Sequence, residues 1–489
     1  MASISPAGCI ESLPYQNGSH DFAAHFISTE ILTRPTNHSV TVSLVPKSDL
    51  QIALEYGTST DGLSCPMPAS PARAGSPFNA TIEGLQPDEL YYYRICCRES
   101  VSDGDSGSIE YLRGPLHIFH TQRSGSGKIN ANSTFSFGIQ ADSHPERMGK
   151  MFDPALYEQT MRNAGEGGLD FYISLGDDFS IDGLIEKKRI NRSSVDAVYM
   201  SQRKYLGIVG SSTPIFLVNG NHEQAARYLL DGTQESPAVC AGISRMSFFP
   251  QPTPDGFYSG DDEKIEFVGL PGDYYSWRWA DALFIVIDPY WHSPSAVDNQ
   301  AGSKGRKHTA GRRDLWNITL GEAQYRWFKR TLEESDATYK FVFAHHVLGT
   351  GRGGIENANL YEWGGIDQKG VWEFDRRRPG WQQPIQQLMA ENGVDIFFQG
   401  HDHLFARQEL DGVVYQEVPC PADPTFSAFN ADSYTSGTIF PNSGYLRVTV
   451  SSQNATVDYV KSYLPRQETA TEYNGMVAYS YVLPGGKSR

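Results

Sequence analysis

Six of the 13 histidines lie in five short polar clusters, and each cluster directly follows an apolar run of the chain. Polar side chains at the end of a buried strand are costly to keep, since an unpaired buried polar group destabilises a fold by roughly 1–3 kcal/mol. Their recurrence therefore indicates that they bind something. In chain order, the clusters are Ala141-Asp142-Ser143-His144, Gly176-Asp177-Asp178, Asn219-Gly220-Asn221-His222-Glu223, His345-His346 and Gly400-His401-Asp402-His403.

The residue types in these clusters are those of a metal site. Imidazole, carboxylate and amide oxygen together suit Zn, Mn or Fe better than copper–thiolate or iron–sulfur chemistry. There are more candidate ligands than the four that one tetrahedral ion needs, which favours two ions. A carboxylate such as Asp177 could bridge them, and ions about 3.5–4 Å apart can activate a water and clamp an in-line displacement.

Each cluster taken alone also has a purely structural explanation. An Asp-x-His after a strand is often a turn or a cap, and Gly-Asp-Asp is a common turn signal. The His-His pair alone is more often unrelated to a metal, whereas Gly-His-Asp-His is the most specific of the five. The metal interpretation depends on the whole set, because all five clusters follow apolar runs.

Strands and helices must alternate if they are to bring these clusters together. The apolar runs predict strands over 134–140, 169–175, 214–218, 339–344 and 394–398. Helical composition or spacing is found over 154–168, 183–208, 320–335 and 384–393. Further strands are predicted over 264–270 and 282–288, with an antiparallel meander after residue 410. Open α/β sheets bind ligands beyond the carboxyl ends of their strands, where all five clusters lie.

The preceding residues have a different pattern, with short strands separated by turns over 21–122. This spacing predicts an antiparallel β-sandwich. The Leu85-x-Pro87 turn followed by the Tyr-rich strand 91–94 resembles fibronectin type III and related Ig-like modules. The Ser/Gly/Asn-rich segment 123–133 predicts a linker. We therefore expect one domain over 21–122 and a second, α/β domain over 134–485.

The composition argues against several classes of protein. A net charge of −16 disfavours nucleic-acid binding, which needs a basic face. No apolar run approaches the ~18 residues of a transmembrane helix. The six cysteines form no Cys-x-x-Cys pair, so we expect a few disulfides rather than a zinc ribbon. The N-terminus has no signal peptide as written, and seven Asn-x-Ser/Thr sequons would permit glycosylation in a eukaryotic secretory host. We expect a secreted or periplasmic protein. The pattern does not determine the oligomeric state.

The order of the five clusters resembles the calcineurin-like metallophosphoesterase superfamily. The pattern of that family is Asp-x-His, Gly-Asp-x, Gly-Asn-His-Glu/Asp, a strand-end His and Gly-His-x-His, and the likeness covers roughly 134–460. Within it, the Ig-like domain, the stretch 272–277 and the helix over 320–332 resemble the purple acid phosphatases. The resemblance implies a catalytic domain built as a layered α-β-β-α sandwich with mixed sheets.

The resemblance also implies a role for individual residues. Asp142, His144 and His403 would bind one ion, Asp177 would bridge, and Asn221, His345 and His401 would bind the other. His222 would stabilise the oxyanion or protonate the leaving group. His345 is preferred to His346 because the ligand of the family is usually the first residue after the strand. His346 would then lie behind the ligands or face the substrate, and the alternative is that the two exchange roles.

One position departs from the purple acid phosphatases. They have a tyrosine three residues after the bridging aspartate, which binds ferric iron, whereas this sequence has Ser180. We therefore do not expect a tyrosinate–iron centre. The two ions could be Fe, Mn, Zn or another divalent metal.

We expect an enzyme, a two-metal-dependent hydrolase of small-molecule phosphate esters. It would be an acid phosphatase-like phosphomonoesterase in which a metal-activated hydroxide attacks phosphorus in line. Arg352 and the basic segment 304–313 could attract the anionic ester, and Asp402 could orient a ligand imidazole. The same site could instead act on phosphodiesters or sulfate esters. A non-catalytic adhesion or binding protein with a degenerate metal site is the remaining alternative.

Overall fold

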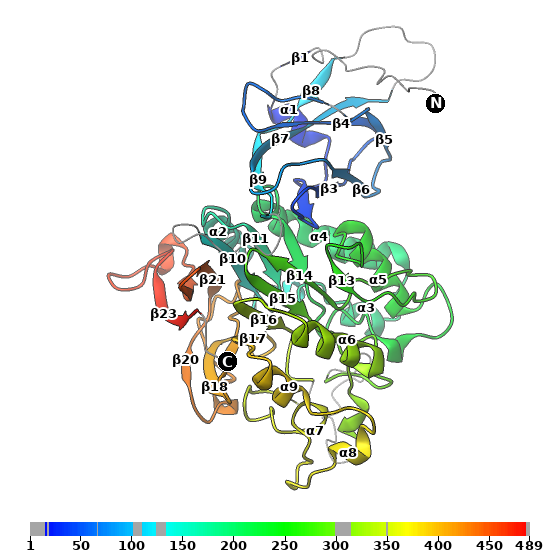
Figure 1. Ribbon diagram of the computed structural model, residues 1–489. Helices are drawn as coiled ribbons and strands as arrows, with labels where there is room; N and C mark the ends of the chain where they lie inside the picture. Colours follow the sequence, from blue (N-terminus) through cyan, green and yellow to red (C-terminus); the bar gives the residue numbers. More distant parts are fainter. Residues whose placement is uncertain are drawn as a thin grey trace, which may run out of the picture.

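The computed structural model describes residues 15–16, 19–65, 67–100, 110–123, 134–298, 314–348 and 351–485. An N-terminal β domain lies at one end of a larger α/β domain (Figure 1). The basic segment 304–313 lies outside the described residues, as does the predicted linker apart from its first residue, Arg123.

Two sheets form the N-terminal domain. The larger contains, in spatial order, β1 (Tyr15–Gln16), β8 (Tyr111–Arg113), β7 (Leu90–Glu99), β4 (Leu50–Gly57) and β5 (Ser70–Ala72), with β9 (His117–His120) also paired to β7. The smaller contains β2 (Ile31–Thr33), β3 (Val40–Leu44) and β6 (Phe78–Ile82). All pairs are antiparallel except the short β1–β8 pair. Side chains from both sheets share one core, which confirms the predicted β-sandwich.

Two mixed sheets form the centre of the α/β domain. What we call the first sheet contains β12 (Ile215–Leu217), β11 (Phe171–Ser174), β10 (Thr134–Gln140), β21 (Gly444–Ser451), β22 (Asn454–Lys461) and β23 (Val477–Pro484). The second sheet contains β13 (Ser259–Gly260), β14 (Tyr275–Trp279), β15 (Ala282–Val286), β16 (Tyr339–Phe343), β17 (Ile396–Gln399), β19 (Val413–Glu417), β18 (Phe405–Leu410) and β20 (Thr438–Phe440). Strands β10, β11 and β12 are parallel, as are β15, β16, β17 and β19, whereas β21 runs antiparallel to β10.

Helices cover the outer face of each sheet (Figure 1). Side chains of α2, α4 and α5 pack on Tyr172 and Ile215 of the first sheet, and those of α6, α7 and α9 pack on Ile285 and Phe397 of the second. The helices are α1 (Ser19–Ala24), α2 (Pro154–Gly165), α3 (Asp182–Glu186), α4 (Arg192–Gly210), α5 (Pro237–Phe248), α6 (Gly321–Glu333), α7 (Tyr361–Gly364), α8 (Phe374–Arg377) and α9 (Ile385–Glu391). The layer order is helix, sheet, sheet, helix, which confirms the predicted α-β-β-α sandwich.

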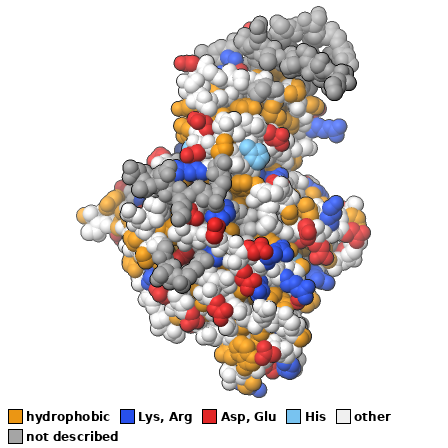
Figure 2. Space-filling view, viewed as in Figure 1, with side chains coloured by type: hydrophobic (Ala, Val, Ile, Leu, Met, Phe, Trp, Pro, Cys, Tyr) orange, Lys and Arg blue, Asp and Glu red, His pale blue; other side chains and the backbone are white. Residues whose placement is uncertain are grey.

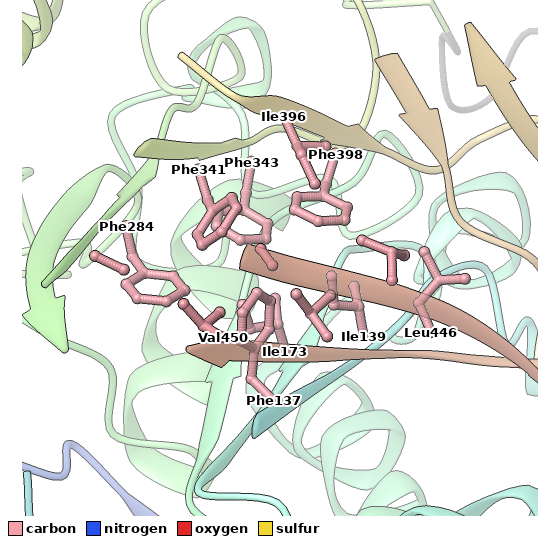
Figure 3. Packing of buried hydrophobic residues seen from close by; sticks show 14 of the residues in the cluster. Phe137, Ile139, Ile173, Phe284, Phe341, Phe343, Ile396, Phe398, Leu446 and Val450 are labelled. Atoms are coloured by element: carbon pink, nitrogen blue, oxygen red, sulfur yellow. The ribbon is translucent and has the colours of Figure 1, made fainter. Parts of the chain in front are cut away.

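Aromatic and aliphatic side chains fill the space between the two sheets (Figure 3). Phe137 of β10 stacks on Phe171 with ring centroids 5.3 Å apart and meets Phe284 of the second sheet edge-on at 5.2 Å. On β16, Phe341 faces this core while Val342 faces the helices. Because strand side chains alternate between faces and both faces are buried, these strands have continuous apolar sequences. This core holds the two sheets together, and so places their strand ends side by side.

Two sequence predictions of elements differ from the structure. The predicted strand over 264–270 is wrong, because the chain turns back at Phe267 and Gly269, which have φ of 68° and 83°, and only an isolated bridge joins Ile265 to Gly269. The predicted helix over 183–208 is two helices, α3 and α4. Asn191 separates them, because its side chain caps α4 by accepting from the peptide N–H of Ser194 at 2.9 Å.

Buried polar contacts join the two domains. The Arg203 guanidinium of α4 is fully buried and donates to the carbonyl of Ser43 on β3 at 2.7 Å. In the other direction, the Tyr93 hydroxyl of β7 donates to the carbonyl of Ser211 at 2.6 Å. These contacts fix the N-terminal domain against α4 and the turn that follows it.

The surface and the cysteines bear on three further expectations. Within the described ranges, no helix has the length and apolar character needed to cross a membrane. The five described cysteines are free thiols, so the expected disulfides are not formed among them. Cys96 and Cys97, for example, face different clusters on opposite sides of β7. Acidic and basic side chains are interspersed over the face seen in Figure 2.

Candidate metal centre

The structure brings the five predicted clusters together where strands of the two sheets end. Asp142 and His144 follow β10, Asp177 follows β11, Asn221 and His222 follow β12, His345 and His346 follow β16, and His401 and His403 follow β17. The first three strands belong to the first sheet and the last two to the second. All of these residues except His222 are buried, and its side chain is 17% exposed.

Asp142 lies at one end of the cluster. Its Oδ2 accepts the peptide N–H of His401 at 2.7 Å, which leaves Oδ1 to face the histidines. Oδ1 lies 3.3 Å from Nε2 of His403, 3.7 Å from that of His144 and 3.8 Å from that of His345. Asp142, His144 and His403 thus form one group of atoms that a single ion could join.

Asp177 lies between this first group and a second one, to which His345 and His401 belong. Its Oδ1 accepts the peptide N–H of His222 at 2.8 Å, and its Oδ2 faces three imidazoles. Oδ2 is 3.1 Å from Nε2 of His345, 3.6 Å from that of His144 and 3.8 Å from that of His222. One carboxylate oxygen therefore faces ligands from both sheets, as a bridge between two ions requires.

Asn221 and His401 form the far end of the cluster. Nδ1 of His401 lies 3.1 Å from Oδ1 of Asn221, and His401 shares a group with Asp177 and His345. The other ring nitrogen, Nε2, is 3.2 Å from the Asp298 carboxylate. Such an outer carboxylate fixes the orientation of a metal-binding imidazole. Asp298 is one of the residues that the sequence patterns did not single out.

The two adjacent histidines of the second sheet have different surroundings. His345 holds Nδ1 against the carbonyl of Leu175 at 2.9 Å and turns Nε2 towards Asp177. His346 faces the Tyr290 hydroxyl, 3.5 Å from its Nδ1, and its ring lies 4.7 Å from that of His401. His345 is therefore the one that points between the two aspartates, while His346 packs behind His401.

His222 lies at the more accessible side of the centre. Nδ1 of His222 lies 2.7 Å from Oδ2 of Asp182, so the ring turns its other nitrogen, Nε2, away from Asp182. Arg147 comes within 3.4 Å of that nitrogen. Asp182 and Arg147 both lie outside the recognised clusters, although Arg147 is only three residues beyond His144.

Asp402 and Arg352 interact with each other and with the backbone rather than with a ligand imidazole. Arg352 donates to the carbonyl of His401 at 2.6 Å and to Oδ1 of Asp402 at 2.9 Å. Oδ2 of Asp402 accepts from the Gly353 peptide at 2.7 Å and the Tyr434 hydroxyl at 2.8 Å. The expectation that Asp402 orients a ligand imidazole is therefore wrong, because its oxygens are used by a loop. Instead, the Glu146 carboxylate contacts a ligand imidazole, since it lies 2.8 Å from Nδ1 of His144.

Glycines and a glutamate allow the loops of the first sheet to converge. The Glu223 carboxylate accepts the peptide N–H groups of Asp177 at 3.0 Å, Asp178 at 2.8 Å and Gly220 at 2.6 Å. A side chain at Gly220 would collide with Asp177, and one at Gly400 would lie 2.6 Å from Ala141. The motif glycines are therefore required for close packing of neighbouring loops.

The backbone at five of the candidate ligands adopts the left-handed conformation. The φ values are 61° at Asp142, 48° at His144, 60° at Asp177, 81° at His401 and 56° at His403. Each such residue costs about 1–3 kcal/mol, and clusters of them are typical of functional sites. Asp, Asn and His tolerate this region better than other residues that have a Cβ.

Burial and neighbouring charges act in opposite directions on the pKa values of the centre, and which of them dominates differs between residues. Burial raises the pKa of Asp142, but the charges of His403 and His345 hold it well below its ordinary value. Burial lowers the pKa of His144, yet its contacts with Asp142 and Glu146 raise it to about 9. The pKa of His403 is lowered to about 4, chiefly by burial.

The donor set fits divalent metal ions. Oδ1 of Asp142 and Nε2 of both His144 and His345 are buried without a hydrogen-bond partner in the described part of the chain. These atoms face one another, and a cation would satisfy them. Carboxylate, amide and imidazole donors are those that Zn, Mn and Fe accept. At the position of the missing tyrosine, Ser180 follows Phe179, whose ring stacks on Tyr199 at 4.4 Å.

Comparison with known families agrees with this geometry. The profile of the calcineurin-like phosphoesterase family matches residues 135–405, which is more than half of the chain. The chain therefore belongs to the calcineurin-like phosphoesterase family. No curated protein matches the sequence.

Two solved structures are similar to the whole molecule. One is described as the structure of PhoD, with a TM-score of 0.64 and 13% sequence identity, and the match covers 98% of this chain and 92% of that one. The other is the purple acid phosphatase PPD1 from yellow lupin (Lupinus luteus) seeds, with a TM-score of 0.59 and 15% identity, covering 93% of this chain and 74% of that one. At these identities the likeness concerns the fold alone.

Proposed function

We propose that this chain is a two-metal-dependent hydrolase of phosphate esters that prefers small phosphomonoesters. Membership of the phosphoesterase family supports the reaction class. The observation that carries the proposal is the position of Asp177 Oδ2, within 3.1–3.8 Å of three imidazoles supplied by both sheets. Buried atoms without partners on Asp142, His144 and His345 support metal binding at the same place.

The geometry supports a division of the ligands between two ions. Asp142, His144 and His403 would hold one ion, and Asn221, His345 and His401 the other, with Asp177 shared. When bound, two such ions lower the pKa of a water and clamp the phosphoryl oxygens during in-line displacement. The identity of the ions, among Fe, Mn, Zn and other divalent metals, stays a prediction.

His222 is assigned the proton transfer to the leaving group. The Asp182 carboxylate at Nδ1 orients the ring, and the imidazole reaches the edge of the centre at Nε2. Burial lowers the pKa of His222, but the charge of Asp177 and the contact with Asp182 raise it overall. A protonated His222 can therefore donate to an ester oxygen, which typically contributes about 10²–10⁴-fold to the rate.

Arg147 is assigned to the anionic ester. Its side chain is 32% exposed and lies next to His222, so it can reach a ligand that approaches the centre. The roles of Arg352 and His346 in substrate binding stay predictions. Arg352 already pairs with Asp402, which leaves it better placed to hold the loop after His401.

The test combines metal analysis with a substrate panel on the full chain. We expect hydrolysis of an aryl phosphate to exceed that of a bis-aryl phosphate and an aryl sulfate, and to be lost after treatment with a chelator. Faster turnover of the diester or the sulfate would move the assignment to a phosphodiesterase or a sulfatase. Well under one ion per chain, with no turnover, would favour a non-catalytic binding protein.

A variant tests the role of His222. His222→Ala should lower kcat by about 10²–10⁴-fold while the metal content stays that of the wild type. Glu266→Ala, on an exposed turn away from the centre, is the matched control and should change neither. Wild-type turnover by His222→Ala would exclude this role. Location outside the cytoplasm stays a prediction, which the cellular fractionation of the natural host would test.

A further inference from the structure

A second group of metal-binding side chains lies outside the candidate metal centre. Asp261, Asp273 and His292 each place a ligand atom so that all of these atoms lie within 4.8 Å of one another. Nε2 of His292 is 3.0 Å from Oδ2 of Asp273. Asp273 is completely buried, and Asp261 is only 3% exposed. One imidazole therefore contacts the Asp273 carboxylate and has a ligand atom within 4.8 Å of one from Asp261.

One oxygen of this group has no partner. Oδ1 of Asp273 is buried and accepts no hydrogen bond from the described residues. Arg245 is a nearby cation, but its donors go to the carbonyls of Gly272 at 2.7 Å and Leu217 at 2.7 Å, and to that of Pro271 at 3.2 Å. An unpartnered carboxylate oxygen in a buried position is destabilising unless something else binds it.

The surroundings add further negative charge. Asp288 is also buried, and its oxygens accept from Asn219 Nδ2 at 2.7 Å and from the Tyr290 peptide at 2.6 Å. Burial, followed by the repulsion of Asp273, raises the pKa of Asp261 to about 7. Burial, followed by the repulsion of Asp273, likewise raises the pKa of Asp288 to about 7, so the charge of Asp273 acts on both other carboxylates.

We propose that Asp261, Asp273 and His292 bind an additional divalent cation, separate from the candidate metal centre. Mixed carboxylate and imidazole ligands select a borderline transition-metal ion, of which Zn²⁺ is the representative used in the test. Water would complete the coordination, because three protein ligands converge among the residues that the structure describes.

The position of the ligands indicates a structural role for this ion. Asp261 directly follows β13, Asp273 precedes β14, and His292 follows β15, so that one ion would join three connections at an edge of the second sheet. Asp288, described above, accepts a hydrogen bond from the side chain of Asn219, which lies two residues before Asn221. An ion here would therefore stiffen the segment that carries Asn221 without touching the reacting atoms.

Bound metal measured on paired variants tests the site. After loading with Zn²⁺ and desalting, Asp261→Asn should contain one ion per chain fewer than the wild type and should have a lower Tm. The adjacent, exposed Asp262→Asn is the matched control and should match the wild type in both measurements. A shared proton between Asp261 and Asp273 is the competing explanation. In that case Asp261→Asn would keep the wild-type metal content, and this result would overturn the proposal.

Wild-type crystals provide a test that does not depend on the folding of a variant. Crystals soaked in Zn²⁺ should show an anomalous peak about 2.0–2.2 Å from ligand atoms of Asp261, Asp273 and His292. No peak at that place overturns the proposal, whatever the same map shows at Asp142 and Asp177. Peaks at the candidate metal centre concern the proposed function alone, so that the two can fail separately.

Discussion

The first sheet supplies mainly oxygen donors to the candidate metal centre, and the second supplies only imidazoles. Asp142, Asp177 and Asn221, with His144, follow strands β10 to β12, whereas His345, His401 and His403 follow β16 and β17. Neither sheet has a complete ligand set. A shared apolar core joins the two sheets and includes Phe343 and Phe398, two and three residues before His345 and His401, so the arrangement of the candidate ligands depends on the packing directly beneath them.

The largest loss of activity is expected at Asp177, whose carboxylate faces imidazoles from both sheets. Asp177→Asn removes the charge that faces imidazoles of both sheets, and should lower kcat/KM by about 10³-fold or more, since a metal clamp contributes several kcal/mol. Both ions should be lost in the metal analysis. The neighbouring Asp178→Asn is the control, because Asp178 faces Gln140 and Ser143 instead. Retention of both ions by Asp177→Asn would contradict the assigned bridge.

The next effect separates the two adjacent histidines of the second sheet. His345→Ala should bind one ion fewer than the wild type. Its activity should fall by more than the roughly 10–100-fold expected when a residue that only supports a metal ligand is removed. His346→Ala should keep its metal content, because His346 packs behind His401. Metal analysis and kcat on the two variants make the comparison. If His346→Ala loses the ion and His345→Ala keeps it, the two histidines have the opposite roles.

Smaller effects, each on a different ion, are expected from the outer carboxylates. Asp298→Asn weakens the support of His401, a ligand of the second sheet, and Glu146→Gln weakens that of His144, from the first. Each should lower the affinity for one ion by about 10–100-fold. Metal titrations should show loss at different sites in the two variants, and loss of the same ion in both would contradict the division of ligands.

The smallest effect concerns the free energy of unfolding and a residue of the first sheet, Lys461. Burial lowers the pKa of Lys461, at the end of β22, to about 7. Between pH 7 and about 10 the unfolded chain holds this proton and the folded chain does not, so the stability of the wild type should rise with pH relative to Lys461→Met. Denaturant unfolding of both proteins across this range measures the difference. Parallel curves would show that Lys461 stays charged when folded.

The sequence was sufficient to predict which side chains the structure brings together, because each cluster is local. An apolar run of five to seven residues and the polar residues after it are visible in one stretch, and the five stretches identify both the strands and the chemistry. The alternation of strands and helices predicted an α/β domain, and the resemblance to the family implied its α-β-β-α layers. The turn at 264–270 was missed because the apolar residues Ile265 and Phe267 have strand-like spacing, whereas their backbone reverses direction.

Contacts between distant residues could not be predicted in this way. Strand β10 pairs with β21, about three hundred residues later in the chain, and no local pattern indicates that pairing. The partners of the ligands show the same limit. Asp298 and Asp182 contact His401 and His222 across intervals of more than 35 residues, and both lie in segments of ordinary composition.

The left-handed backbone at five ligands restricts how this centre could change during evolution or engineering. At Asp142, His144, Asp177, His401 and His403, a replacement must both bind a metal and accept positive φ. Few residues besides Asp, Asn and His do both, so cysteine or glutamate ligands are poor substitutes there. Changes in metal preference should therefore arise at positions without this constraint, such as Asn221, His345 and Ser180.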